Sequence, residues 1–241
     1  MEICPILDNR LKTISEFVRD GSTVADIGTD HAYLIAYLAA TGKIKKGFAC
    51  DINELPLSKA KITIKKYSLE EKIDCVLTDG LIGLNLDEID DIIVAGMGGD
   101  TIVDILTAEK YNFTGKRFIL QPMTKCERLR EGLCSLGIKI LEETPVTSGR
   151  FTYTLLICEY TGETIACDEI YKYLGEIVKS KSENRNRYLK RVYNNISKRL
   201  DGLIKTTGHE DEIKNYNAIL EKIKDCVGGN KLESKRNPKS N

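Results

Sequence analysis

The sequence has no tryptophan, only two histidines among its 241 residues, and no long apolar run. A helix that crosses a bilayer needs roughly 18–20 consecutive apolar residues, and no segment approaches that length. The first ten residues, MEICPILDNR, also lack the basic and then apolar regions of a signal peptide. These absences predict a cytoplasmic protein that has no part in a membrane.

The usual spacings of metal ligands are absent too. The eight cysteines form no C-x-x-C pair, and His31 and His209 lie far apart in the chain, so the pattern of a Cys/His zinc site is missing. Most of the cysteines have apolar neighbours, which is typical of small buried hydrophobic residues. The sequence therefore predicts no metal site and a reducing compartment.

The net charge of zero hides an asymmetry between the two ends of the chain. Residues 1–162 carry 19 Lys and Arg against 24 Asp and Glu, a balance of −5, whereas residues 163–241 carry 17 against 12, a balance of +5. A basic end on an acidic body suggests a polyanionic partner. The alternative is a set of lysine-rich helices that only face solvent.

Short β-branched runs alternate with helical segments over the first 136 residues. This alternation is typical of a parallel sheet with helices on both faces. Strands are predicted at residues 22–27, 46–51, 73–78, 91–95 and 117–121, with helices at 33–40, 56–67, 101–107 and 127–136. Two further strand-like runs, 138–145 and 151–160, have no helix between them, so they must be antiparallel. We therefore predict an α/β, Rossmann-like class I methyltransferase fold with a seven-stranded sheet whose last strand is antiparallel.

The strand pattern stops after Gly162. Apolar residues then recur at intervals of three, four or seven over residues 170–203 and again over 213–227, with a turn at 206–209. The spacing predicts one long amphipathic helix and a second helix packed antiparallel to it, as a coiled-coil-like hairpin. The predicted domains are a catalytic domain at 1–162, a helical hairpin at 163–228 and a polar, disordered tail at 229–241.

Acidic residues follow the first three predicted strands, where a parallel sheet binds its ligands. Asp26, Asp30, Asp51 and Asp79 stand at these strand ends. Carboxylates repel a pyrophosphate, but they suit a cationic sulfonium, an amino group and a ribose diol. Of the glycine pattern that cradles a pyrophosphate, only Gly28 remains. The pattern favours S-adenosylmethionine over NAD.

The candidate cofactor-binding residues share a place at or just after a predicted strand end. They are Asp26, Gly28, Asp51, Asn53, Asp79, Gly80, Gly96, Met97 and Gly98. Each acid could instead cap a turn, and each glycine could serve only a tight turn. Their occurrence at consecutive strand ends favours the binding role.

Four segments together resemble one known family. DIGTDHAYL at residues 26–34, DINELPL at 51–57, IVAGMGG at 93–99 and LQPM at 120–123 are similar to the bacterial tRNA adenine-N1 methyltransferase family called TrmK. The resemblance covers roughly residues 8–160, and Leu55 stands where the family usually has glycine. It implies S-adenosylmethionine as methyl donor, adenine 22 of the tRNA D-arm as target, and a coiled-coil-like C-terminal domain.

The proposed chemistry places a carboxylate beside the target base. N1 of adenine has a free lone pair, so it needs orientation rather than a base, and methylation leaves the ring cationic. Asp30, with His31 as neighbour, is the candidate that stabilises this charge. The predicted substrate-binding residues are Tyr33, Gln121, Pro122, Arg185, Arg187, Lys190 and Arg191. We expect tRNA as the partner, and a monomer or weak dimer.

Two other function classes stay open at this point. One is a methyltransferase for another substrate; the N/D-P-P-Y tetrapeptide of exocyclic-amine methyltransferases is absent after the fourth strand. The other is a protein that binds tRNA or S-adenosylmethionine without catalysis. A dinucleotide oxidoreductase is less favoured because the glycines of its phosphate loop are missing.

Overall fold

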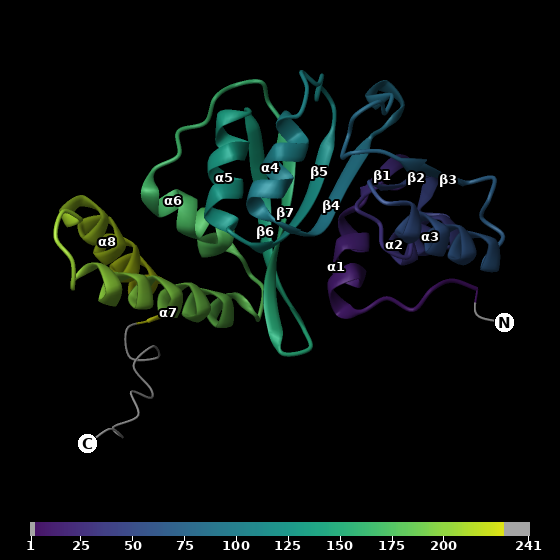
Figure 1. The fold of residues 1–241 in the computed structure, drawn as a ribbon. Coiled ribbons are helices and arrows are strands. Elements are labelled where there is room, and N and C mark those ends of the chain that lie inside the picture. The colour runs from purple at the N-terminus through teal and green to yellow at the C-terminus, as the bar shows by residue number, and fades with distance from the viewer. Residues whose placement is uncertain (1–2, 229–241) are drawn as a thin grey trace.

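A single seven-stranded sheet forms the centre of the molecule (Figure 1). The computed structural model describes residues 3–228. The strands are β1 (Ser22–Ile27), β2 (Ile44–Asp51), β3 (Ile73–Leu77), β4 (Asp91–Gly98), β5 (Arg117–Thr124), β6 (Ile138–Ser148) and β7 (Phe151–Tyr160). Their order is β3-β2-β1-β4-β5-β7-β6. Six of these strands run in the same direction, and β7 runs in the opposite direction. This confirms the predicted fold class.

Helices cover both faces of the sheet. On one face lie α1 (Asn9–Phe17), α2 (Tyr33–Ala40) and α3 (Glu54–Lys66), and on the other lie α4 (Gly99–Thr107) and α5 (Cys126–Ser135), with the short η1 (Leu86–Glu88) before β4. The sequence prediction missed α1. Its start is marked by Asp8, whose Oδ1 accepts a hydrogen bond from the Leu11 amide at 2.8 Å. Such an N-cap stabilises the first turn, and Ile14 and Val18 then bury the apolar face.

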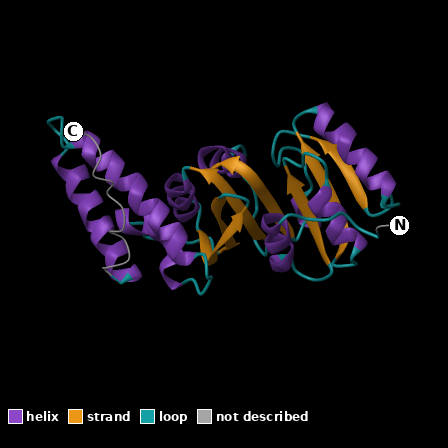
Figure 2. Ribbon diagram, turned by 90° about the horizontal axis from the view of Figure 1, so that it is seen from below, coloured by secondary structure: helices purple, strands orange, loops and turns teal. Residues whose placement is uncertain are grey.

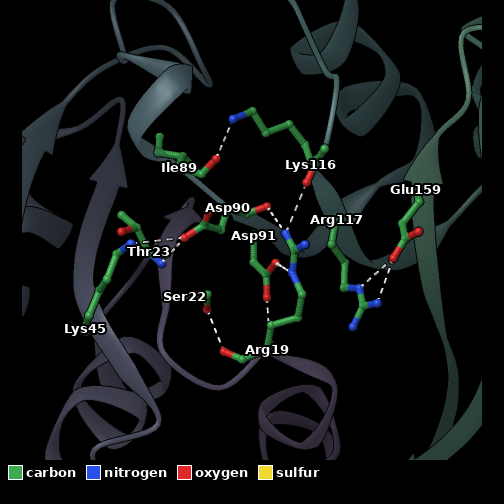
Figure 3. A network of polar contacts seen from close by, with 11 residues as sticks. Arg19, Ser22, Thr23, Lys45, Ile89, Asp90, Asp91, Lys116, Arg117 and Glu159 are labelled. Atoms are coloured by element: carbon green, nitrogen blue, oxygen red, sulfur yellow. Dashed lines mark hydrogen bonds and ion pairs between the residues drawn. The ribbon is translucent and has the colours of Figure 1, made fainter.

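A polar network fastens the edge of the sheet where β1 and β4 begin (Figure 3). Arg19 follows α1, and its Nε donates to the fully buried Asp91 carboxylate at 2.6 Å. The same guanidinium donates to the Asp90 carbonyl at 2.5 Å, while the Asp90 carboxylate accepts from the Thr23 amide at 2.7 Å. Because this network lies at the amino ends of the parallel strands, it stabilises the fold at the edge opposite the predicted ligand site.

The C-terminal part is a set of helices set beside the sheet (Figure 2). They are α6 (Glu169–Leu174), η2 (Gly175–Lys179), α7 (Arg185–Leu203) and α8 (Glu210–Val227), and they share a separate apolar cluster. The predicted single helix over 170–203 is wrong, because the chain breaks between α6 and α7. At Gly175 φ is +48°, and a Cβ there would lie 2.3 Å from Arg130 Nε. The predicted disordered tail at 229–241 lies outside the described residues.

A buried ion pair joins these helices to the sheet. Arg130 of α5 and Glu143 of β6 are 1% and 0% exposed, with Nε and Oε1 2.8 Å apart. The guanidinium also donates to the carbonyls of Lys172 and Tyr173 at 2.7 and 2.9 Å, and Glu143 Oε2 accepts from the Ile177 amide. The pair therefore has hydrogen-bond partners on both sides of Gly175, in α6 and in η2, and it holds these two elements against the sheet.

None of the described helices is long and apolar enough to span a membrane. The described cysteines are free thiols. Burial raises the pKa of several of them, and that of Cys126 rises to about 11, so its thiol is protonated near neutral pH.

Breaking the buried pair should loosen the attachment of the helices. We expect Glu143→Gln to lower the free energy of unfolding by about 3–5 kcal/mol, because it leaves the buried Arg130 charge uncompensated. Urea unfolding measures this, and limited proteolysis should cut faster between β7 and α6. Arg128→Ala is the control, since Arg128 lies on the same helix in an exposed pair and should change stability by less than about 0.5 kcal/mol. Equal effects of the two variants would contradict the assigned role.

Candidate functional site

The carboxyl ends of β1, β2, β3, β4 and β5 meet at one edge of the sheet because these strands are parallel. The chain order reverses beside β1, which places β2 on one side and β4 on the other. Such a switch point is where open α/β sheets bind ligands. The structure thus brings the predicted cofactor-binding residues to one edge, since all of them stand at or just after a strand end.

Asp26 is a buried carboxylate at this edge. It is 7% exposed, and burial raises its pKa to about 6, against the lowering effects of a Thr29 hydrogen bond and the nearby Arg10 charge. Along β1 it alternates with Ala25 and Ile27, so it points to the face covered by α1 and α2. An ionised group with so little water around it attracts a cation strongly.

Arg10 of α1 completes a buried polar cluster that the sequence prediction missed. Its Nη1 donates to Gln121 Oε1 at 2.8 Å, and the Gln121 amide nitrogen donates to the Pro122 carbonyl at 3.0 Å. Gln121 lies in the second half of β5, on the same face of the sheet as Asp26, and β4 runs between them. The β4 residue paired with Gln121 is Ala95. No sequence signal joined Arg10 to this edge, because α1 itself was missed.

The loop after β1 bends sharply toward solvent. Gly28 has φ of +77°, a backbone conformation that favours glycine, and the end of the Met97 side chain packs against it. Asp30 is 69% exposed, and its carboxylate lies 3.4 Å from His31 Nε2 and 3.8 Å from Lys59 Nζ. The Tyr33 ring stacks on His31 with centroids 5.1 Å apart. The predicted catalytic residues and Tyr33 therefore lie together on the open side of the edge.

The carboxylates that follow β2 and β3 differ in their exposure to solvent. Asp51 is half-buried, and its Oδ1 accepts a hydrogen bond from the Asn53 amide at 2.8 Å. That bond orients the carboxylate and leaves Oδ2 for a ligand. Asp79 is exposed, and the buried Gly80 that follows it has φ of +63° and packs against Ile105.

The last residues of β4, where the strand turns into α4, include the remaining predicted glycines. Gly96 has φ of +85°, and a Cβ there would meet nothing within 4 Å, so open space lies in front of this backbone. Gly98 precedes α4, and at Gly99 a Cβ would lie 2.1 Å from the Lys125 carbonyl. The turn therefore lies against the β5–α5 turn, which keeps the ends of β4 and β5 together.

Basic side chains gather on α7, which has six Lys or Arg and one Asp. Three of the predicted tRNA contacts, Arg187, Lys190 and Arg191, have no ion pair in the part of the chain that the structure describes. Arg185 differs, because its guanidinium donates to the Val178 and Cys226 carbonyls at 2.9 and 3.1 Å. These bonds join η2 to the end of α8, so Arg185 holds the helices together.

Comparison with known proteins identifies the family. Residues 7–156 match the family model described as a methyltransferase domain. The curated tRNA (adenine(22)-N(1))-methyltransferase of Bacillus subtilis (strain 168) is 35% identical over 173 residues, which are 71% of this chain and 73% of that protein. The chain belongs to the bacterial tRNA (adenine(22)-N1)-methyltransferase family. The predicted resemblance to this family is confirmed.

Solved structures of the same family superpose on most of the chain. The crystal structure of B. subtilis TrmK, an m1A22 tRNA methyltransferase, gives a TM-score of 0.79 at 26% identity and covers 92% of this chain and 99% of that one. The structure of M. capricolum TrmK in complex with S-adenosyl-homocysteine gives 0.77 at 28% identity, with 92% and 99% covered. The likeness therefore includes the C-terminal helices.

The residues at the edge fit S-adenosylmethionine. The free oxygen of Asp51 would accept from the ribose diol, and the open space in front of Gly96 suits a ligand against the backbone. The amino group and sulfonium would lie near the Asp26 carboxylate, while Arg10 would hold the cofactor's own carboxylate. No group of three or more His, Cys, Asp or Glu in residues 3–228 is placed to hold a metal ion.

The raised pKa of Asp26 predicts a pH-dependent stability. Between pH 3.8 and about 6 the folded protein keeps a proton that the unfolded chain has lost, so the contribution of this group to stability falls as pH rises through that range. Asp26→Asn should remove this loss of stability. Above pH 6 its free energy of unfolding should exceed that of the unaltered protein by up to about 3 kcal/mol. Urea unfolding at pH 4 to 7.5 measures both effects.

The control for this series is Asp20→Asn, because the Asp20 side chain is 89% exposed. It should keep the pH profile of the unaltered protein. Parallel profiles for the unaltered protein and Asp26→Asn would show that Asp26 ionises normally and is no buried charge.

Proposed function

We propose that the protein is an S-adenosylmethionine-dependent methyltransferase that methylates N1 of adenine 22 in the D-arm of tRNA and acts in the cytoplasm. One observation carries the proposal. In a chain of this family, acidic residues and glycines gather at the carboxyl ends of the parallel strands, around the buried carboxylate of Asp26. Residues 3–162 form the catalytic part and residues 163–228 the part that docks tRNA.

S-adenosylmethionine supplies an electrophilic methyl group. The protein's task is to orient adenine N1 in line with that group, because the N1 lone pair needs no activation. Tyr33 and His31, stacked in parallel at the open side, offer an aromatic surface for the base. Gln121 is held by Arg10, so the position of its side chain on β5 is fixed.

Asp30 is placed to stabilise the positive charge that develops on the adenine ring. Its carboxylate is exposed enough for a large substrate to reach, and Lys59 and His31 lie beside it without covering it. A carboxylate near the exocyclic amine lowers the energy of the cationic product-like state. It can afterwards accept the proton that restores the neutral ring.

Helix α7 gives the enzyme a basic surface for the tRNA backbone. Arg187, Lys190 and Arg191 are the candidates. Contacts of this kind recognise the shape of an RNA helix and weaken as the salt concentration rises. The direct contacts of α7 with β6 and β7 hold this surface beside the sheet.

Methyl transfer tests the function directly. With tritiated S-adenosylmethionine, the protein should label a tRNA transcript that has adenine at position 22, and reverse transcription should stop there, because N1 methylation blocks base pairing. The same transcript with guanine at position 22 should stay unlabelled. Label in both transcripts, or stops at another position, would favour a methyltransferase with a different substrate; no label with intact S-adenosylhomocysteine binding would favour a binding protein.

Substitution of Asp30 tests its assigned role. Asp30→Asn should lower kcat by about 10²-fold, the cost of removing one electrostatic stabiliser of a transition state, and leave S-adenosylhomocysteine affinity within about twofold. Steady-state kinetics and calorimetry measure the two. The control is Asp74→Asn, an exposed carboxylate on β3 that pairs with Lys46 at 2.8 Å, which should change neither. Unchanged turnover in Asp30→Asn would remove Asp30 from this role.

A further inference from the structure

A cavity of about 290 Å³ lies between the end of β5 and helix α7. Met123 and Lys125 line it from the sheet side, Thr154 from β7, and Arg191, Asn195 and Arg199 from α7. Figures 1 and 2 show α7 passing beside the β6–β7 end of the sheet. Pro122 lines the same cavity and directly follows Gln121, so the cavity begins next to the acidic edge.

Three polar groups in this cavity have donors or acceptors to spare. Thr154 is 1% exposed, and its Oγ1 has no hydrogen-bond partner within residues 3–228. The Arg191 guanidinium lies 4.9 Å from the centre of the Tyr188 ring and forms no ion pair with any described residue. The exposed Asn195 side chain makes no hydrogen bond to the described part of the chain, so it is free to contact a ligand in the cavity. A buried hydroxyl without a partner is costly, which points to a ligand that supplies one.

The other charged groups around the cavity are already engaged. Arg199 donates to the Tyr173 hydroxyl at 3.2 Å and pairs with Glu127 at 3.4 Å. Lys125 pairs with Asp100, and Arg130 is held by Glu143. The single acid of the lining, Glu127, is thus neutralised by Arg199. The free positive charge therefore belongs to Arg191, beside a neutral amide and a hydroxyl.

This combination fits one nucleotide of an RNA strand. A guanidinium that already stacks on a ring binds a phosphate through its remaining donors. An asparagine and a threonine hydroxyl can bond to a ribose 2′-hydroxyl or a base edge. The volume is at the lower end of ligand pockets, so it suits a single nucleotide and excludes a duplex.

We infer that this cavity is a subsite for one tRNA nucleotide near the target adenine, with its phosphate on Arg191 and its sugar or base edge on Asn195 and Thr154. The inference rests on the proposed function and adds a specific contact to it. The subsite spans both parts of the chain, so tRNA would bind only when α7 is held against the end of β5. It assigns Arg191 to a defined cavity, whereas Arg187 and Lys190, the other two candidates on α7, lie outside that cavity.

Kinetics with a tRNA transcript test the subsite. Arg191→Ala should raise KM for tRNA by about 10-fold or more, as expected when a phosphate contact in a defined site is lost. Thr154→Val should raise it about 3- to 10-fold, while the melting temperature stays equal or increases, because the valine leaves no unpaired hydroxyl. S-adenosylhomocysteine affinity should stay unchanged in both. Lys198→Ala is the matched control, since it removes one exposed charge from the same helix outside the cavity.

Ethylation interference identifies the phosphate. One ethylated phosphate near adenine 22 should weaken binding to the unaltered protein and to Lys198→Ala, and this effect should disappear in Arg191→Ala. If Arg191→Ala and Lys198→Ala behave alike, or if AMP fills the cavity without competing with tRNA, the subsite is refuted while the function stands. An unaltered protein that transfers no methyl group to tRNA refutes the proposed function instead.

Discussion

A buried negative charge at the end of β1 is the constraint around which the functional end of this molecule is organised. Asp26 is surrounded by protein, so ionising it costs free energy, as its raised pKa records. Part of that cost is offset by Thr29 and by Arg10, which reaches the site from α1. Arg10 in turn donates to Gln121 of β5. Asp26, Arg10 and Gln121 thus bring polar groups from β1, α1 and β5 together at this end of the sheet.

This arrangement explains the preference for a cationic ligand in physical terms. A pyrophosphate would add negative charge beside Asp26 and Asp51, whereas a sulfonium and an amino group reduce the charge imbalance. The carboxylate at the end of β2 stands where open α/β sheets contact a ribose. The exposed Asp30 serves a different purpose, because it faces the side from which a large substrate approaches.

The buried ion pair of Arg130 and Glu143 connects the sheet to the C-terminal helices. The pair contributes little net stability by itself, because desolvation opposes its Coulomb energy. Its carbonyl and amide partners lie in α6 and η2, so its main effect is geometric. It holds the chain that leads into α7 against α5 and β6.

Much of the fold follows from the sequence, because strand–helix alternation and the final antiparallel pair are local patterns. The strand-end acids were found for the same reason. Arg10 was missed because its partner Gln121 is 111 residues away and the short α1 has a weak pattern. The helix break at Gly175 was missed because it depends on the Arg130 side chain filling the space of a Cβ. Spacing alone could not show that Arg185 bonds to backbone carbonyls inside the hairpin.

The most direct test of the central claim is a crystal structure of the protein with S-adenosylhomocysteine. The ribose diol should lie within hydrogen-bond distance of Asp51, and the amino acid end should lie between Asp26 and Arg10. A ligand bound elsewhere, or its ribose away from Asp51, would contradict the account.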